Sequence, residues 1–456
     1  MNKKIVIIGA GITGLATAHW LKKDGYNVTI LEANSVVGGS MVTEKENGYL
    51  IDFGPNSGLE TSPLIKTLVD DLGINDKFIY ANKAGNKRYI LRDNIIHVLP
   101  MSLKDFLSTK LFSTKAKLRL GLEPFIGKSE DGYYQSISNF VSRRLGREFL
   151  DYAINPFVAG VFAGDPDKLS VKSAFPKLYR LEELYGGLIK GTIKGARERK
   201  KSGEKSKQNA AMFSFTDGMV ALPNALYSDM KESVSLNSKV TSVKNYYDKY
   251  QIEFINNGVA ETLNADLVIS TAPSQATSVI FNNLDYKLSE HLNQIYYPPV
   301  MVLYLGYDKK NIGHPLDGFG FLIPSKEKKK FLGALWSSVI FNDRAPEGKA
   351  SFTLFIGGAR SPELFSDDNK TLIDEAIKEF ESLMQITGKH EFIKSKFWNR
   401  AIPQYNIGYV EHANYFSKFE EANKGIILGG NYVGGISVGD CIKSSEVIFN
   451  KVKERL

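Results

Sequence analysis

Three glycines and one acidic residue near the start of the chain have the types and spacing of a ligand-binding turn. Gly9, Gly11 and Gly14 form the pattern G-x-G-x-x-G, and Glu32 follows at the end of the next expected strand. In such a turn the first glycine permits a sharp bend, the second leaves room for a pyrophosphate, and the third lets a helix pack close to a strand. Free backbone N–H groups at the start of that helix bind phosphate, and the acid accepts hydrogen bonds from ribose hydroxyls.

The elements around this pattern decide between a dinucleotide site and a chance glycine-rich turn. Residues 5–8 form an unbroken apolar run, which is typical of a parallel strand buried on both faces. A helix is expected after the glycines, and residues 28–31 form a second strand that ends at Glu32. This βαβ context favours dinucleotide binding.

A second glycine pair argues for FAD rather than NAD. Gly38 and Gly39 follow the acid, and residues 48–56 supply two more candidates, Gly54 and Asn56. NAD does not need these residues, whereas they suit a longer cofactor that continues past the first turn. An ordinary glycine-rich loop is the alternative for this segment.

Composition limits the class of protein. The chain has 456 residues, 43% hydrophobic and 24% charged, as in ordinary globular proteins of two or three domains. The single cysteine, Cys441, excludes an intramolecular disulfide and fits a reducing compartment. The six histidines are scattered, so we expect no metal site.

Charge and hydropathy limit the partners and the location. The formal net charge of +8 is too dispersed to indicate nucleic acid, but it is compatible with an anionic membrane surface or an acidic substrate. No apolar run reaches the roughly 18 residues of a membrane span, and we expect no signal peptide before the first strand. We expect a cytoplasmic protein, with peripheral attachment to the inner face of the cytoplasmic membrane left open.

The middle of the chain, residues 101–207, has the apolar spacing of helices. The interleaved basic residues include Lys104, Lys110, Lys115, Lys117 and Arg119. An amphipathic basic segment either lies on a membrane surface or packs as a helical domain with a solvated basic face. Residues 197–207 are strongly charged, and we expect a solvated loop there.

The flanking segments predict two sheets. A helix is expected at residues 62–72, and a hairpin at residues 88–91 and 95–99 surrounds Asp93-Asn94. The strands expected in the nucleotide-binding unit are residues 235–243, 250–255 and 265–273. The strands expected in an antiparallel sheet are residues 300–306, 318–323, 333–341 and 351–358. Two helices follow, one at residues 371–385 and a last one that starts near Gly439.

These elements predict a mixed α/β and α+β fold, with a Rossmann-like FAD-binding domain, an antiparallel-sheet substrate domain and an inserted helical domain. The FAD-binding domain is expected in three parts, at residues 1–85, 211–285 and 396–456. The helical domain is expected at residues 96–210, and the substrate domain at residues 286–395 together with 86–95.

Four further motifs resemble those of the porphyrinogen oxidase family of FAD enzymes, within the larger group of amine oxidases and phytoene desaturases. They are Lys87-Arg88-Tyr89, residues 155–170 with Ala174-Phe175-Pro176 after them, residues 401–405, and Gly429-Gly430-Asn431-Tyr432. The resemblance covers nearly the whole chain. In one departure, Val36 stands where the family usually carries an arginine near the cofactor phosphates, which puts one ionic contact in doubt but leaves the backbone N–H groups.

The resemblance implies a flavin oxidase that converts a porphyrinogen to an aromatic porphyrin in three two-electron steps, without a catalytic side chain. The residues that it places at the substrate cavity are Asn56, Gly160, Leu322, Leu335 and Phe355. Without the resemblance, the three large apolar residues among them would be interpreted as core. Arg88 is the favoured anchor for a substrate carboxylate because its guanidinium is a planar fork, and Arg92 is the rival.

The expected FAD contacts come from all three parts of the FAD-binding domain. They are Gly9, Gly11, Gly14, Glu32, Gly38, Gly39, Gly54, Asn56, Val240, Trp398, Ile436, Ser437 and Val438. By the resemblance, Val240 pairs its backbone with the adenine, while Trp398 and residues 436–438 close over the flavin. The N-terminus of the last helix then stabilises negative charge on the reduced flavin.

The preferred activity is oxidation of protoporphyrinogen IX to protoporphyrin IX in haem synthesis, with oxygen as acceptor. Oxidation of coproporphyrinogen III is the close alternative, and its additional carboxylates would need additional cations, for which Arg88, Arg92, Lys177 and Arg180 are candidates. An amine oxidase or carotenoid desaturase is more distant, and a flavin-binding protein without activity is the non-enzymatic alternative. A quinone as acceptor, a ferrochelatase-like partner and a homodimer stay open.

Overall fold

The parallel sheet at the nucleotide-binding end is assembled from stretches that lie far apart in the sequence. Residues 3–202, 210–366 and 368–456 are described in this computed structural model, and the strand order of the sheet is β10-β2-β1-β14-β20. Its strands are β1 (Lys4–Ile8), β2 (Asn27–Leu31), β10 (Val234–Ser235), β14 (Leu267–Ser270) and β20 (Ile426–Leu428). Each neighbouring pair is parallel, so the predicted βαβ unit is confirmed.

Both faces of this sheet are covered, which explains the unbroken apolar run of β1. Ile5 and Ile7 face one core, and Val6 and Ile8 face the other. The first core is closed by α1 (Ile12–Lys23), α2 (Pro63–Asp71), α11 (Ala221–Asp229) and α18 (Val438–Arg455). The second core is closed by β11 (Ser238–Tyr246), β12 (Lys249–Asn256), β13 (Val259–Ala265), α12 (Ser274–Phe281), α13 (Tyr286–Asn293) and α16 (Tyr409–Ala422).

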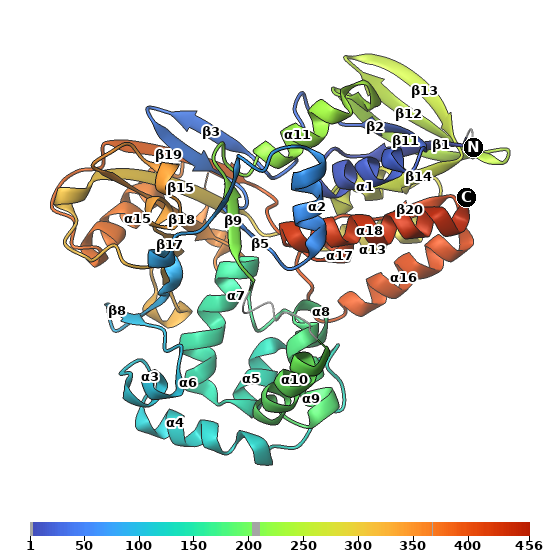
Figure 1. Ribbon diagram of the computed structural model, residues 1–456. Helices are drawn as coiled ribbons and strands as arrows, with labels where there is room; N and C mark the ends of the chain where they lie inside the picture. Colours follow the sequence, from blue (N-terminus) through green and yellow to red (C-terminus); the bar gives the residue numbers. More distant parts are fainter. Residues whose placement is uncertain (1–2, 203–209, 367) are drawn as a thin grey trace.

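The molecule has two upper lobes in Figure 1: the parallel sheet and its covering elements lie at the upper right, and a seven-stranded sheet lies at the upper left. The seven-stranded sheet packs one face against α15 (Lys370–Leu383). Its strand order is β19-β15-β18-β17-β16-β7-β8, in which β16 and β7 are parallel and the other neighbours antiparallel. The strands are β7 (Tyr89–Arg92), β8 (Ile95–Val98), β15 (Val300–Asp308), β16 (Gly320–Leu322), β17 (Phe331–Leu335), β18 (Lys349–Gly357) and β19 (Phe392–Trp398). The predicted hairpin is confirmed, because Asp93 and Asn94 both have positive φ, as a tight two-residue turn requires.

Small elements join the two lobes. The strands of the joining sheets are β3 (Thr43–Glu46), β4 (Tyr49–Asp52), β5 (Gly58–Leu59), β6 (Phe78–Tyr80) and β9 (Met212–Phe215). The short helical turns are η1 (Lys83–Asn86), η5 (Lys231–Ser233), η6 (Lys309–Asn311), η7 (Ser325–Glu327), α14 (Ser337–Ile340), η8 (Asn342–Arg344), η9 (Pro362–Leu364) and α17 (Asn431–Gly434).

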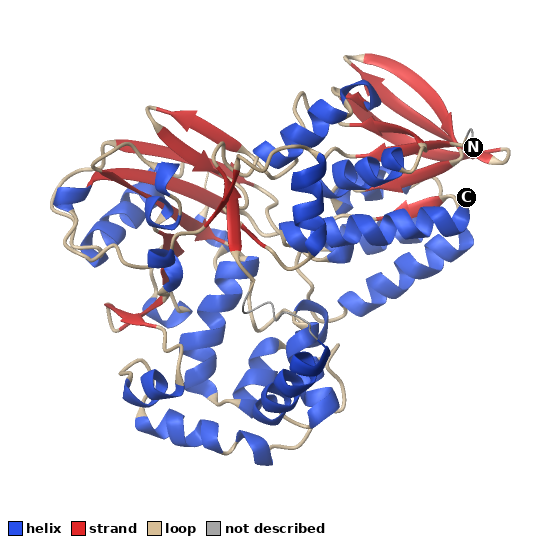
Figure 2. Cartoon of the chain, in the orientation of Figure 1, coloured by secondary structure: helices blue, strands red, loops and turns tan. Residues whose placement is uncertain are grey.

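The region between β8 and β9 is helical, as predicted, and lies below the two sheets (Figure 2). Its elements are α3 (Leu103–Ser108), α4 (Thr114–Gly121), η2 (Glu123–Phe125), α5 (Ile137–Arg144), α6 (Arg147–Phe149), η3 (Leu150–Ile154), α7 (Asn155–Phe162), α8 (Val171–Ala174), α9 (Pro176–Tyr185) and α10 (Leu188–Ser202). Serine side chains cap four of these helices by accepting from backbone N–H groups, namely Ser102, Ser113, Ser136 and Ser170.

A buried ionic network holds the helical region together. The guanidinium of Arg144 is fully buried, lies 3.0 Å from Glu123 Oε1, and also donates to the Glu182 carboxylate. Burial raises the pKa of Glu182, but hydrogen bonds from Ser129, Arg143 and Arg144 outweigh it and hold that pKa below its ordinary value. The network therefore keeps the Glu182 carboxylate charged inside the fold.

Two predicted strands are wrong in part. Residues 235–243 are not one strand, because a turn with Asn237 at positive φ separates β10 in the parallel sheet from β11 in the antiparallel one. Residues 333–341 are a strand only as far as Leu335, after which α14 turns the chain away. In α14 the Ser337 hydroxyl bonds that of Thr353 at 2.8 Å, so a polar contact replaces the expected ladder.

The predicted loop at residues 197–207 is also wrong where the structure describes it. Helix α10 continues to Ser202, while residues 203–207 lie outside the described residues. Lysine, arginine and glutamate are good helix formers, so their charge does not by itself indicate a loop.

We propose that the chain divides into the three domains expected from sequence, with two limits moved. Strand β19 runs through residue 395 and belongs to the seven-stranded sheet as far as Trp398. Helix α13 packs its Leu288 and Leu292 in the second core of the parallel sheet. The cofactor domain then extends beyond residue 293, and its last part begins after residue 398.

The Arg144 network predicts a large stability effect. Arg144→Leu leaves Glu123 buried without its cation and leaves Glu182 with Arg143 alone, and we expect the free energy of unfolding to fall by about 3–5 kcal/mol. Urea unfolding followed by circular dichroism measures this. Lys77→Met, at an exposed pair with Asp217, is the control, and we expect it to change stability by less than about 1 kcal/mol. Equal losses in both variants would contradict the account.

Candidate functional site

The first glycine turn has the geometry of a phosphate-binding loop. Gly9 has φ of +100°, and its N–H donates to Leu31 O at 2.9 Å. A Cβ on Gly14 would lie 2.1 Å from Gly9 O, so only glycine lets α1 approach β1 this closely. Gly11 faces open space, since a Cβ there would meet no protein atom within 4 Å. The N-terminus of α1 has neither a side-chain cap nor an acid in its first turn, which leaves its N–H groups available to an anion.

Glu32, which is predicted to bind the ribose, also holds this turn in place. Its carboxylate is buried and accepts from Ala10 N at 2.7 Å, and from the backbone N and side-chain amide of Asn34 at 2.9 and 2.7 Å. A carboxylate has about four acceptor positions, so room remains for one ribose hydroxyl. Ser238 N–H donates to Glu32 O at 2.7 Å, which brings β11, and Val240 on it, beside this turn.

The second glycine pair packs directly on the first turn. Gly38 N–H donates to Ala10 O at 2.8 Å, and a Cβ on Gly39 would contact Gly11 Cα at 3.5 Å. A Cβ on Gly54 would lie 1.8 Å from Ser40 O, so that turn also requires glycine. These contacts form one backbone cradle from β1 to residue 54. The cradle fits a long dinucleotide such as FAD, while Val36 is 65% exposed at its edge.

The predicted flavin end of the cradle is formed where three segments meet. Trp398 Nε1 donates to Phe53 O at 2.9 Å, and Asn56 Nδ2 donates to Asp52 O at 3.0 Å. On the other side, Ile436 packs beside the helical core, and Ser437 caps α18, which begins at Val438. The Ser437 hydroxyl also donates to Asp440 in the first turn of α18 at 2.6 Å. That acid reduces the positive potential that the sequence led us to expect at this helix end.

Register places the predicted apolar residues on one face of the seven-stranded sheet. Leu322 pairs with Gly333, and Gly333 with Phe355, so Leu322 and Phe355 share a face. Leu335 lies two residues beyond Gly333 on β17 and therefore faces the same way. All three side chains are half-buried, whereas the opposite face is packed against α15. Gly333 pairs between Leu322 and Phe355, and a Cβ there would lie 3.0 Å from Leu322 Cδ2.

Helix α7 closes this face from below. A Cβ on Gly160 would lie 2.7 Å from Leu322 Cδ2, so a larger residue there would displace Leu322. Phe355 packs against two hydrophobic clusters. One contains Phe53 and Trp398, and the other contains Ala159 of α7. Two apolar residues of α7 that the sequence did not suggest, Phe157 and Val161, are 40% and 41% exposed beside Gly160.

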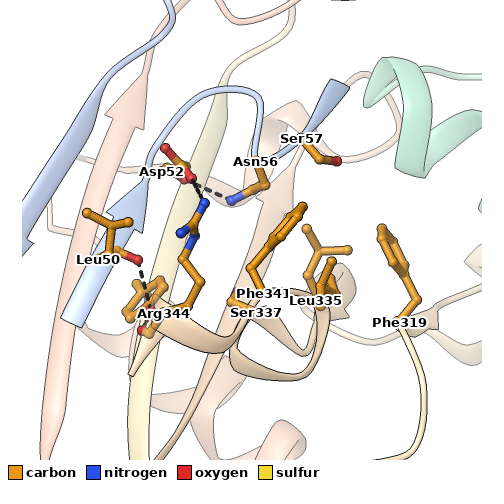
Figure 3. A pocket seen from close by; sticks show the side chains of 11 residues that line it. Leu50, Asp52, Asn56, Ser57, Phe319, Leu335, Ser337, Phe341 and Arg344 are labelled. Carbon is orange, nitrogen blue, oxygen red and sulfur yellow. Dashed lines mark hydrogen bonds and ion pairs between the residues drawn. The ribbon is translucent and has the colours of Figure 1, made fainter. Parts of the chain in front are cut away.

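A narrow cavity opens where the cradle meets the sheet, and Figure 3 shows it from close by. Asn56 and Leu335, both predicted from the resemblance, line it together. Its other lining residues are Leu50, Asp52, Ser57, Tyr304, Phe319, Ser337, Ile340, Phe341 and Arg344. The cavity is mostly apolar, with one buried acid and one buried base in its wall.

Arg88 is the better placed of the two candidate anchors. Its side chain is exposed, its guanidinium lies 5.2 Å from the Phe319 ring, and it has no ion pair within the described part of the chain. Although the residue as a whole is exposed, neighbouring groups shield part of its guanidinium from water, which lowers the pKa of Arg88 without an acid nearby to raise it. Arg92 donates instead to Glu148 and to Leu111 O at 2.7 and 2.6 Å, and so stabilises the helical region.

Several residues at the site were missed by sequence reasoning. Thr271 donates to the carbonyls of Ile8 and Gly9 at the first glycine turn, and its place after the buried strand β14 was a usable signal. Phe319, Asp52 and Arg344 carry no such signal, because their neighbours come from distant segments. No group of three potential metal ligands occurs within residues 3–202, 210–366 and 368–456.

Comparison with known proteins identifies the class. Residues 12–446 match the family of flavin-containing amine oxidoreductases. The chain is 35% identical to protoporphyrinogen oxidase 2 of Arabidopsis thaliana, covering 97% of this chain and 92% of that protein. It is 29% identical to coproporphyrinogen III oxidase of Bacillus subtilis, covering 97% and 96%. A crystal structure from Exiguobacterium sp. 255-15 has the same fold, with a TM-score of 0.82 over the whole of both chains at 20% identity.

The chain is therefore an FAD-dependent oxidoreductase. It belongs to the flavin-containing amine oxidoreductase family, and the resemblance to porphyrinogen oxidases within that family is confirmed. The prediction of FAD is confirmed with it. The roles of the individual residues stay predictions.

The open space at Gly11 predicts a selective loss of cofactor. In Gly11→Ala the new methyl group meets no protein atom within 4 Å, so we expect unchanged thermal stability of the apoprotein. The methyl group blocks the pyrophosphate path, so we expect the Kd for FAD to rise roughly tenfold or more, which is about 1.4 kcal/mol. Titration of apoprotein with FAD, followed by flavin fluorescence, measures this. Gly121→Ala, also in open space, is the control, and unchanged affinity in Gly11→Ala would remove Gly11 from the site.

Proposed function

We propose that the protein oxidises protoporphyrinogen IX to protoporphyrin IX, with oxygen as the final acceptor. FAD held in the glycine cradle would supply the redox chemistry of each of the three two-electron oxidations. The observation that carries the proposal is the single face of the seven-stranded sheet that holds Leu322, Leu335 and Phe355 opposite the cofactor cradle. A broad apolar macrocycle needs such a face.

The residues of this chain contribute position and exclusion of water. Leu322, Leu335 and Phe355 contact the macrocycle from the one face of the sheet that they share. The apolar wall keeps water from the reacting carbon. Arg88, free of any acid in the described residues, pairs with a substrate carboxylate at the edge of the face.

Coproporphyrinogen III is the close alternative, and cation placement bears on the choice. It carries propionates where protoporphyrinogen carries vinyl groups, so its cavity needs further cations. Arg92 already donates to the Glu148 carboxylate, and Arg180 is exposed on α9 in the helical region. This supports the substrate with fewer carboxylates, as does the higher identity to a protoporphyrinogen oxidase.

Porphyrin fluorescence tests the proposal. Purified FAD-loaded protein in air is offered protoporphyrinogen IX and coproporphyrinogen III in parallel, with heat-inactivated protein as the control for spontaneous oxidation. We expect faster growth of fluorescence with protoporphyrinogen. Preference for coproporphyrinogen would select the alternative, and no growth with either would overturn both.

Arg88 predicts a binding defect rather than a cofactor defect. Charge-assisted hydrogen bonds contribute about 1.5–3 kcal/mol, so Arg88→Ala should raise KM roughly tenfold to a hundredfold, with unchanged FAD content. Arg88→Lys keeps the charge without the planar fork, so its KM should lie between those of the wild type and Arg88→Ala. Lys87→Ala, whose partner is Asp317, is the neighbouring control. A normal KM in Arg88→Ala would remove the assignment.

We further propose that the protein attaches peripherally to an anionic membrane, at its cytoplasmic face. Within the described residues, no helix combines the length and apolar character needed to cross a bilayer. The helical region instead carries a patch of exposed large apolar side chains on and beside α3 and α4, the helices that lie at the lower edge of the ribbon in Figure 1. The patch comprises Met101, Leu103, Leu107, Leu118, Leu122 and Phe125, each at least 55% exposed.

The charges around this patch suit anionic lipid headgroups. Lys104, Lys110 and Lys115 are exposed on the same segment. Lys117 and Arg119 were expected to join them, but they donate to backbone carbonyls and stabilise the helices. Apolar side chains flanked by lysines are typical of surfaces that lie on a membrane.

Flotation with anionic liposomes tests this attachment. We expect the protein to float at low and moderate salt, and Leu118→Ser with Phe125→Ser to prevent flotation by removing apolar burial. Tyr247→Ser is the matched control, because Tyr247 is 91% exposed on the β11–β12 turn at another end of the molecule. Wild-type protein that stays at the bottom of the gradient would contradict the proposal.

A further inference from the structure

A buried ion pair joins the cofactor cradle to the seven-stranded sheet. Asp52 ends β4, and Arg344 ends η8 just before β18. Their side chains are 2% and 3% exposed, and Arg344 Nη2 lies 3.6 Å from Asp52 Oδ2 (Figure 3). The two residues come from segments that lie far apart in the sequence, and both line the cavity that Asn56 and Leu335 share.

Asp52 organises the cradle side of the contact. Its Oδ1 accepts from the Thr43 hydroxyl at 2.5 Å and from Met219 N at 2.9 Å. Gly218 has no room for a side chain, because a Cβ there would lie 2.8 Å from Asp52 Oδ1. Two hydrogen bonds therefore fix the carboxylate in addition to its contact with Arg344.

Arg344 organises the sheet side. Its Nη2 donates to Ser214 Oγ at 2.7 Å and to Phe215 O at 3.2 Å. Its backbone carbonyl accepts from the Tyr304 hydroxyl at 2.6 Å, and that hydroxyl also reaches Leu50 O at 3.2 Å. Arg344 thus ties the sheet to β9 and β4 together.

The pair is incompletely satisfied on the side of the cavity. Asp52 Oδ2 and Arg344 Nη1 are buried and have no hydrogen-bond partner within the described residues. Burying charged atoms without hydrogen-bond partners costs free energy, so other interactions of the fold must offset the cost of this pair. Burial raises the pKa of Asp52 and lowers that of Arg344, with each partner opposing the shift of the other.

The turn after Asp52 depends on the position of this pair. The Asp52 carbonyl accepts from Asn56 Nδ2, and the next carbonyl, that of Phe53, accepts from Trp398 Nε1. Gly54 packs against Ser40 in the cradle. Asp52 is therefore the fixed end of the short turn that presents Asn56 to the cavity.

We infer that Asp52 and Arg344 are positioning residues, which hold the turn at residues 53–56 at the distance from the sheet that the bound flavin requires. Neither is a catalytic residue, because each acts through Asn56 and Phe53. The cofactor part of this inference is independent of the substrate, and only its kinetic part rests on the proposed function.

Flavin spectroscopy tests the inference without a porphyrinogen. Asp52→Asn removes the charge at constant shape, Arg344→Met removes the cation, and Arg344→Lys keeps it. We expect Asp52→Asn and Arg344→Met each to shift the absorption spectrum of bound FAD and to raise its Kd at least tenfold. Arg344→Lys keeps the positive charge, so its spectrum and its Kd for FAD should lie closer to those of the wild type. The double variant should be no worse than the worse single variant, because the pair acts as a unit.

Arg144→Lys is the matched control, since Arg144 is an equally buried, acid-paired arginine in the helical region. We expect it to lower thermal stability but to leave the flavin spectrum and Kd unchanged. An unchanged spectrum and Kd in folded Asp52→Asn would overturn the inference, as would the same shifts in Arg144→Lys. With protoporphyrinogen, kcat should fall while KM changes less than threefold. If the wild-type protein does not turn over protoporphyrinogen, the proposed function is wrong, while the spectra and Kd values still test the inference about Asp52 and Arg344.

Discussion

The alternation of side chains along the seven-stranded sheet is the constraint on which the site depends. One face must fill the core against α15, so the other must carry every residue that is left for a ligand. Leu322, Leu335 and Phe355 share that second face because Gly333 pairs with residues on both neighbouring strands. A register shift of one residue would exchange the two faces and remove the site.

The two halves of the site are built from different parts of the polypeptide. The cradle is mostly backbone, since glycines at positions 9, 11, 14, 38, 39 and 54 bring strands and turns into contact. The proposed substrate face is mostly side chain, and the ion pair of Asp52 with Arg344 lies in the wall of the cavity where the face meets the cradle. With this division, one kind of cofactor site can be combined with faces whose side chains differ from one enzyme to another.

The same division explains what the sequence could predict. Glycine spacing and the apolar run of residues 5–8 are local signals, and the βαβ unit, the hairpin at Asp93-Asn94 and the serine-capped helices follow from them. Leu322 and Phe355 have no local signal and were placed only through the resemblance. Asp52 and Arg344 are separated by most of the chain, so no local sequence pattern predicts that they pair. Strand predictions were wrong where the chain changes sheets at Asn237 or turns after Leu335, because tertiary contacts decide both.

The most direct test of the account is a single-turnover measurement of flavin reduction without oxygen. FAD-loaded protein is mixed with protoporphyrinogen IX, and the absorbance of oxidised flavin is followed, with dithionite as the control that the bound flavin is reducible. The account predicts rapid loss of that absorbance and recovery when oxygen is admitted. Flavin that dithionite reduces but protoporphyrinogen leaves oxidised would contradict the central claim that this face presents the substrate to the cofactor.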